Sequence, residues 1–101
     1  MTKSRSDGPM SITAVRVKDE PTNKGEFKYY TDSGIKPGVI AGMRFVCPCG
    51  CGSKSSLRFD TVYASGWACD GNMDKPTVSP SIKQLACRWH GYLRNGRWES
   101  V

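Results

Sequence analysis

The sequence predicts an all-β fold for a small, metal-stapled domain. Short β-prone runs alternate with turn residues along the whole chain. No stretch long enough for three helical turns carries a convincing apolar stripe at helical spacing. Three thiols also fall within five residues, in Cys47-Pro48-Cys49-Gly50-Cys51. Because the hydrophobic fraction is only 38% of 101 residues, the core should be modest and should gain stability from a bound metal.

The N-terminal part divides into a tail and the start of a single domain. Residues 1–10 have few core-forming side chains and are expected to be a disordered tail. One metal-binding β domain is expected over residues 11–101. Residues 11–17 and 27–31 are β-prone, so we predict two strands that could pair across the loop between them.

The cysteine-rich loop is expected at the tip of a two-stranded ribbon. Residues 43–46 form a predicted strand that runs into the loop, and the alternating residues 56–59 carry the chain away from it. Residues 61–68 predict a further strand. Residues 77–82 should be extended, because Pro80 disfavours helix on both of its sides.

The segment 92–99 predicts a β-hairpin. Asn95 and Gly96 stand between two β-prone arms, and Asn-Gly is a preferred two-residue hairpin turn because both residues tolerate positive φ. With this turn, Leu93 and Trp98 should face each other across the hairpin.

Thiols and the chain's single histidine predict a zinc site. Zinc prefers tetrahedral coordination by sulfur and imidazole nitrogen, and the candidates are Cys47, Cys49, Cys51, Cys87 and His90. We favour Cys47 and Cys49 together with Cys87 and His90, and Cys51 is the substitute for either of the first two. Four sulfur and nitrogen ligands leave no open position for water, so the metal is expected to be structural and the protein is not expected to be an enzyme.

Charge and aromatic residues predict a binding surface near the second pair of ligands. The net charge is +6, which favours nucleic acid or an acidic protein as partner, with no small-molecule substrate. Cations and flat rings, which suit phosphate contact and base stacking, are interleaved without an acid among them: Lys83, Arg88, Trp89, Tyr92, Arg94 and Arg97. The alternative is an ordinary solvated hairpin whose aromatic side chains cover the metal site and the core.

Polarity along the chain predicts a cytoplasmic protein. No stretch approaches the roughly 20 apolar residues of a membrane span. The N-terminus lacks an apolar signal-peptide core, since residues 2–7 are all polar. In a reducing cytosol, five cysteines are better explained by metal binding than by disulfides.

Two loops resemble those of Rieske iron–sulfur proteins. Cys87-Arg88-Trp89-His90-Gly91 is similar to their second ligand loop, and Cys47-Pro48-Cys49 is similar to their first, with cysteine in place of histidine. A Rieske centre needs two histidines on one iron, whereas this chain has one histidine. A conventional cluster is therefore excluded. The resemblance leaves zinc on a zinc-ribbon or Rieske-like scaffold, or an electron-transfer protein with an atypical Cys3His 2Fe–2S cluster.

A second resemblance covers roughly half of the chain. The segments 45–52, 77–82 and 87–98 and the residue Trp67 are similar to an uncharacterised family of small bacterial and phage proteins. Its members share a Cys-Pro-Cys-Gly-Cys-Gly loop, a Thr-x-Ser-Pro-Ser-Ile segment and a Cys-x-x-His hairpin. The family is presumed to bind zinc and occurs in phage and prophage genomes and near ubiquitin-like conjugation operons. The resemblance implies an accessory or regulatory zinc protein of phage or prophage type that binds nucleic acid or a protein partner.

Overall fold

The computed structural model describes residues 11–101, which form two β-sheets and no helix. The all-β prediction is therefore confirmed. The expected tail, residues 1–10, lies outside the described residues. Within the part of the chain that the structure describes, no helix is long and apolar enough to cross a membrane.

The five-stranded sheet has the strand order β1-β9-β8-β7-β6, with every neighbouring pair antiparallel. Its strands are β1 (Ser11–Thr13), β6 (Ala68–Cys69), β7 (Val78–Lys83), β8 (His90–Arg94) and β9 (Arg97–Ser100). Consecutive strands from β6 to β9 lie side by side, so the C-terminal third of the chain builds most of this sheet by itself.

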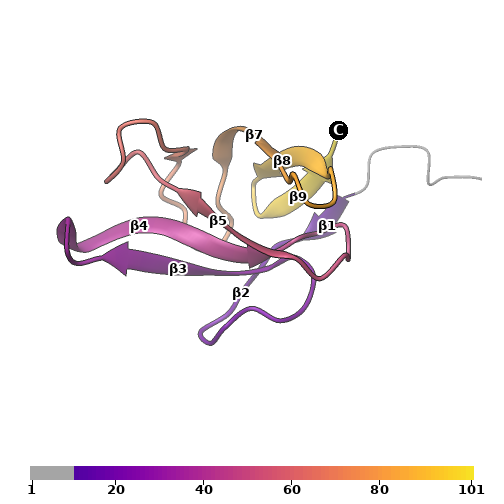
Figure 1. The fold of residues 1–101 in the computed structure, drawn as a ribbon, viewed down its shortest axis with the longest axis horizontal. Coiled ribbons are helices and arrows are strands. Elements are labelled where there is room, and N and C mark those ends of the chain that lie inside the picture. The colour runs from indigo at the N-terminus through magenta and orange to yellow at the C-terminus, as the bar shows by residue number, and fades with distance from the viewer. Residues whose placement is uncertain (1–10) are drawn as a thin grey trace, which may run out of the picture.

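The four-stranded sheet has the order β2-β3-β4-β5. Its strands are β2 (Val15–Arg16), β3 (Glu26–Asp32), β4 (Lys36–Val46) and β5 (Lys54–Arg58). The pairs β3–β4 and β4–β5 are antiparallel, whereas β2 lies parallel to β3. Figure 1 shows β7, β8 and β9 stacked over the end of this sheet at which β4 terminates.

The chain changes sheets at Ala14. The Ala14 N–H donates to the Gly96 carbonyl at 2.8 Å, and the next N–H, of Val15, donates to the Gly25 carbonyl at 3.1 Å. One predicted strand over residues 11–17 is therefore two short strands, one in each sheet. The backbone hydrogen bonds of the chain thus pass from one sheet to the other at a single buried residue, and the two sheets are joined there.

Aromatic side chains from both sheets form the core between them. Trp98 of β9 stacks on Phe45 of β4 with ring centroids 4.8 Å apart, and both rings are almost completely buried. The Trp98 indole N–H donates to the Gly25 carbonyl at 2.9 Å, so its polar atom is also satisfied. Such a stacked pair contributes about 0.5–1.5 kcal/mol beyond the burial of its area. Trp98 therefore links the two layers directly.

The two predicted hairpins are confirmed. Asn95 and Gly96 both have positive φ, 49° and 73°, and Leu93 pairs with Trp98 across β8 and β9. The pairing of β4 with β5 ends at Val46 and Lys54, immediately before and after the cysteine loop. The ribbon thus carries the thiols at its tip.

The predicted strand over residues 61–68 is wrong. After Phe59 the chain turns, with the Val62 and Tyr63 N–H groups both donating to the Phe59 carbonyl, and the Gly66 N–H donating to Tyr63. Only its last residue, Ala68, belongs to a strand, the two-residue β6. Local turn hydrogen bonds outweigh the β-prone character of this segment.

Candidate active site and metal centre

Strands β7 and β8 place a serine hydroxyl beside the chain's single histidine. The Ser81 Oγ atom lies 3.0 Å from the His90 Nε2 atom, and both side chains are partly buried. This separation is within the hydrogen-bond range that a nucleophile and its general base require. Since the sequence contains one histidine, any serine–histidine pair within this chain must include His90.

A bulge in β7 directs Ser81 toward His90. Pairing with β8 passes from Val78 opposite Leu93 to Ile82 opposite Gly91, so the three residues 79–81 face a single residue of β8. The cis Ser79–Pro80 bond lies in this bulge, and the proline has no N–H to donate to the ladder. A bulge of this kind redirects a side chain away from regular alternation.

The backbone on both sides of the pair is held by hydrogen bonds. The Trp67 indole N–H donates to the Ser81 carbonyl at 3.3 Å, and the Val101 N–H donates to the His90 carbonyl at 2.9 Å. Within residues 11–101, no carboxylate hydrogen-bonds to the His90 ring. The described site is thus a serine–histidine dyad without a carboxylate partner, and the backbone carbonyl of each member accepts a hydrogen bond.

Four cysteine thiols converge between the two sheets. Cys47, Cys49 and Cys51 come from the β4–β5 loop and Cys87 from the β7–β8 loop, and their Sγ atoms all lie within 4.8 Å of one another. The Sγ atoms of Cys47, Cys49 and Cys87 are only 3.3–3.5 Å apart. Tetrahedral coordination at a metal–sulfur distance near 2.3 Å places sulfurs about 3.8 Å apart. The four cysteines therefore fit one metal ion.

Turns shape the cysteine loop. The Cys47 N–H donates to the Ser53 carbonyl at 2.8 Å, which closes the loop at its base, and Gly50 N–H donates to the Cys47 carbonyl at 3.2 Å. Gly50 and Gly52 have φ of 92° and 85°, a region that side-chain-bearing residues seldom adopt. The two glycines allow the chain to return each thiol to the same side.

Thiol ionisation differs around the cluster. Burial raises the pKa of the Cys47 and Cys49 thiols, whereas hydrogen bonds from Ser53 lower the pKa of the Cys51 thiol to about 6. Metal binding requires thiolates. A bound cation would stabilise the thiolate forms of Cys47 and Cys49, which burial disfavours.

The ligand set favoured from the sequence differs from this cluster. Cys51 is in the group and His90 is not. The physical reason is the orientation of the His90 side chain. His90 is the first residue of β8, and its ring hydrogen-bonds to Ser81 on the neighbouring strand β7. The Cys-x-x-His spacing therefore joins one cluster residue to one dyad residue.

The basic and aromatic side chains of the hairpin make mostly internal contacts. Trp89 is buried, and its indole N–H donates to the Ser100 hydroxyl at 2.8 Å. The Arg94 guanidinium lies over the Tyr92 ring at 3.8 Å, and Arg97 hydrogen-bonds to hydroxyl groups of β1. The two remaining cations are exposed: Lys83 and Arg88. Trp89 is therefore a core residue and offers no face for base stacking.

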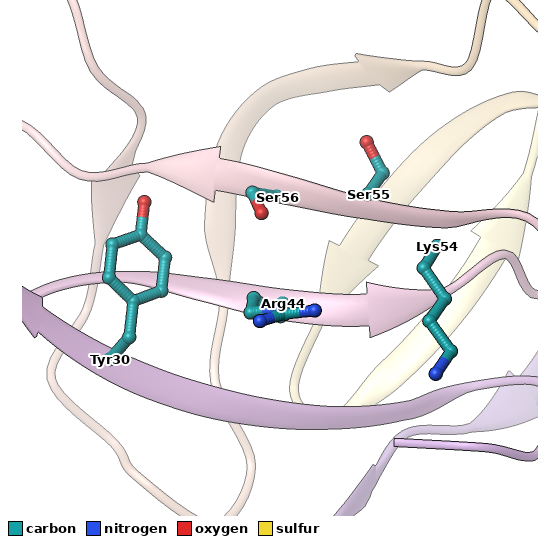
Figure 2. A pocket seen from close by; sticks show the side chains of 5 residues that line it. All are labelled: Tyr30, Arg44, Lys54, Ser55 and Ser56. Atoms are coloured by element: carbon teal, nitrogen blue, oxygen red, sulfur yellow. The ribbon is translucent and has the colours of Figure 1, made fainter. Parts of the chain in front are cut away.

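A second polar cluster lies on the four-stranded sheet. Figure 2 shows that the side chains come from three adjacent strands, and they line a pocket of about 390 Å³: Tyr30, Arg44, Lys54, Ser55 and Ser56. Its cations are already paired, because one oxygen of Glu20 lies 2.6 Å from Arg44 and 3.4 Å from Lys54. The serines of this pocket have no histidine to activate them.

Ser81 was not among the candidate functional residues predicted from the sequence. A usable signal was present, since Pro80 within a β-prone segment indicates a bulge or an edge strand. Because the only histidine, His90, was predicted to be a metal ligand, it was not considered as the base for a serine nucleophile.

The comparisons with known proteins change the functional prediction. The family model described as bacterial ubiquitination-like system serine protease (BubE) matches residues 16–101. No curated protein and no solved structure matches the chain.

The family match corrects four predictions. The chain does not belong to an uncharacterised family without activity, and the prediction that it is not an enzyme is wrong. The roles of a phage accessory protein that binds nucleic acid and of an electron carrier are wrong as well. The match includes both Ser81 and His90 and nearly all of the described residues, and the chain belongs to the BubE family of serine proteases from bacterial ubiquitination-like systems.

Proposed function

We propose that this protein hydrolyses an amide bond, with Ser81 as the nucleophile and His90 as the general base. The observation that supports the assignment is the 3.0 Å separation between Ser81 Oγ and His90 Nε2 in a member of a serine protease family. A serine hydroxyl is a weak nucleophile until an adjacent base takes its proton.

Proton transfer through one imidazole nitrogen accounts for both halves of the reaction. His90 Nε2 accepts the hydroxyl proton as Ser81 Oγ attacks the carbonyl carbon, and it then donates that proton to the leaving amine. The product at this stage is an ester of Ser81. A water molecule, deprotonated by the same nitrogen, cleaves the ester and restores the serine.

The family description supports a protein substrate. A ubiquitination-like system joins the carboxyl terminus of one protein to an amine through an amide bond. We assign as substrate the carboxyl-terminal tail of a ubiquitin-like protein, either extended in a precursor or joined to a second protein. Ser81 and His90 are partly exposed on the sheet, where an extended polypeptide can lie across them.

Zinc is the ion that we assign to the four-cysteine cluster. Four thiolate ligands within 4.8 Å of one another suit tetrahedral zinc. Four sulfurs complete the coordination of the ion, so its role is to hold the two loops together. A cytoplasmic location and an acidic protein partner stay predictions.

Covalent labelling tests the dyad. Wild-type protein, Ser81→Ala and His90→Gln are treated with a fluorophosphonate and analysed by intact-protein and peptide mass spectrometry. Ser79→Ala is the matched control, because Ser79 lies in the same bulge and is exposed, whereas the hydrogen bond to His90 comes from Ser81. We expect one adduct, at Ser81, in the wild type and in Ser79→Ala, and none in Ser81→Ala.

Turnover is measured on a ubiquitin-like protein with a reporter fused to its carboxyl terminus. Loss of a nucleophile or base in a serine protease lowers kcat by a factor on the order of 10⁴ or more. We expect that loss in Ser81→Ala and His90→Gln with unchanged circular dichroism. Wild-type turnover by Ser81→Ala would refute the assignment.

A further inference from the structure

The β7–β8 loop, residues 84–89, connects the two halves of the dyad. Ser81 lies on the strand that enters the loop, and His90 is the first residue of the strand that leaves it. Cys87, a member of the four-cysteine cluster, lies in this loop two residues before Trp89. A segment of two residues, Arg88 and Trp89, therefore joins a cluster ligand to the general base.

The base of this loop is well anchored. The Gln84 N–H donates to the Trp89 carbonyl at 2.7 Å. The buried Trp89 ring makes an edge contact with Trp98 at 6.1 Å and donates its N–H to Ser100. These contacts close the base of the loop and place the residue next to His90, but none of them involves the four residues between Gln84 and Trp89.

The tip of the loop gains little from packing. Leu85 is 86% exposed, and the neighbouring Ala86 is exposed too. Arg88 has a φ of 63°, a left-handed conformation that is strained for a non-glycine residue and persists only when neighbouring contacts impose it. Of the two residues that flank Arg88, Trp89 is held by the core and Cys87 by the cluster.

The cluster ties this loop to the opposite sheet. Three of its thiols belong to the β4–β5 loop of the four-stranded sheet, and Cys87 is the one member from the five-stranded sheet. A metal ion bound to all four would fix the position of Cys87 relative to the whole molecule. Without the ion, the thiols offer only weak contacts at 3.3–3.5 Å.

We propose that the metal-loaded cysteine cluster positions His90 against Ser81, so that metal occupancy controls whether the dyad can react. This inference rests on the proposed function of Ser81 and His90. Cys87 is a positioning residue here, since it acts on the histidine through Arg88 and Trp89. Misplacement of a catalytic group by about 1 Å can slow a reaction on the order of 100-fold, so a loosened loop is sufficient to slow the dyad strongly.

The single histidine gives a direct measurement. In untagged protein, the only imidazole signals in a ¹H–¹³C NMR spectrum belong to His90. The sample is compared with zinc, after removal of zinc by a chelator, and after zinc is restored. Circular dichroism follows the sheets in parallel, and the rate of fluorophosphonate labelling follows the reactivity of Ser81.

We expect zinc removal to shift the His90 signals and to slow labelling of Ser81 at least about tenfold while the β-sheet spectrum is retained. Restored zinc should reverse both effects. Unchanged His90 signals and an unchanged labelling rate in zinc-free protein would overturn the proposal. Complete loss of β-sheet signal would overturn it too, because the cluster would then stabilise the whole domain rather than position one loop.

Variants separate positioning from general stability. Cys87→Ser should reproduce the zinc-free behaviour, and Cys87→His, which restores a zinc ligand, should recover zinc content together with labelling. Cys69→Ser is the matched control, because Cys69 lies outside the cluster. Cys87→His contains a second imidazole, so its signals are first assigned by comparison with the wild-type spectrum. If this variant binds zinc and the His90 signals are normal but it labels no faster than Cys87→Ser, the coupling is wrong.

The readouts also separate this inference from the proposed function. If zinc-loaded wild type is neither labelled nor active, the protease assignment fails, whereas the His90 signals still report whether the cluster controls the histidine. If labelling is normal and independent of zinc, the assignment stands and the coupling fails.

Discussion

The polar side chains of the two sheets lie in different backbone surroundings. In the four-stranded sheet, the pairing of β4 with β5 runs without interruption, although the pairing of β3 with β4 shifts register at Thr31, and the two cations of the pocket in Figure 2 pair with the single carboxylate of Glu20. In the five-stranded sheet, the register between β7 and β8 shifts, and Ser81 meets His90 at that shift. Regular pairing keeps side chains in fixed rows, whereas a bulge redirects one of them. The candidate reactive pair lies where regularity is interrupted.

Matched glycine substitutions test this comparison with the largest expected effect. Gly91 lies beneath Trp89 in the five-stranded sheet, and Gly42 lies beneath Tyr30 in the four-stranded sheet. A Cβ added to either glycine would clash with a backbone carbonyl. At Gly91 it would also lie 2.6 Å from Trp89 Cζ2, and at Gly42 it would lie 2.5 Å from the Tyr30 hydroxyl. Overpacking of this kind costs about 1–3 kcal/mol. We expect Gly91→Ala and Gly42→Ala to lose stability to this extent in urea unfolding.

Activity should distinguish the two variants. Gly91 follows His90 directly, so a displaced Trp89 moves the base, and labelling of folded Gly91→Ala with fluorophosphonate should slow at least about tenfold. Folded Gly42→Ala should label at the wild-type rate. Equal labelling rates in the two variants would show that the two sheets do not differ in the way proposed.

An exposed ion pair should give a smaller effect. Arg44 and Glu20 are 2.6 Å apart but 49% and 43% exposed, and exposed pairs contribute about 0.2–1 kcal/mol. We expect Arg44→Ala to lower the free energy of unfolding by about 0.5 kcal/mol without a change in Ser81 labelling. Lys54→Ala is the matched comparison, since its contact with the same oxygen is longer, 3.4 Å. A loss of labelling in either variant would give the pocket a role in catalysis.

Local patterns predicted the regular parts of the fold. Asn95-Gly96 specified a hairpin because both residues accept positive φ, and it also specified the pairing of Leu93 with Trp98. The cysteine loop between two β-prone runs likewise specified the β4–β5 ribbon. In each case the information lies within about ten residues, which is the range over which turn geometry fixes register.

Contacts between residues that are distant in the sequence could not be predicted from these local patterns. The sequence contains Ser81 and His90 nine positions apart, but only the bulge determines that they touch. The same applies to the change of sheets at Ala14, which depends on carbonyls of Gly96 and Gly25. A Cys-x-x-His spacing is compatible with two ligands or with one ligand beside a base, and tertiary structure decides between them.

The smallest effect should be a loss of folding stability in acid. It should come from Glu26 at the start of β3, in the four-stranded sheet. The Glu26 carboxylate accepts hydrogen bonds from the Thr22 and Asn23 N–H groups at 2.9 and 3.1 Å, and these bonds lower its pKa to about 2. A carboxyl group with a lowered pKa in the folded state stabilises the fold above its ordinary pKa of 4.5, and that contribution is lost as the pH falls from 4.5 toward 2.

Glu26→Gln removes this titration but keeps one acceptor oxygen. We expect the variant to melt slightly below the wild type at pH 7, and the difference to disappear as the pH approaches 2. A metal bound to the cysteine cluster would dissociate in acid from both proteins alike, so the difference between their melting temperatures isolates Glu26. A constant difference from pH 7 to pH 2 would mean that the carboxylate charge contributes nothing. In that case the hydrogen bonds of the loop before β3 would not depend on the charge of Glu26.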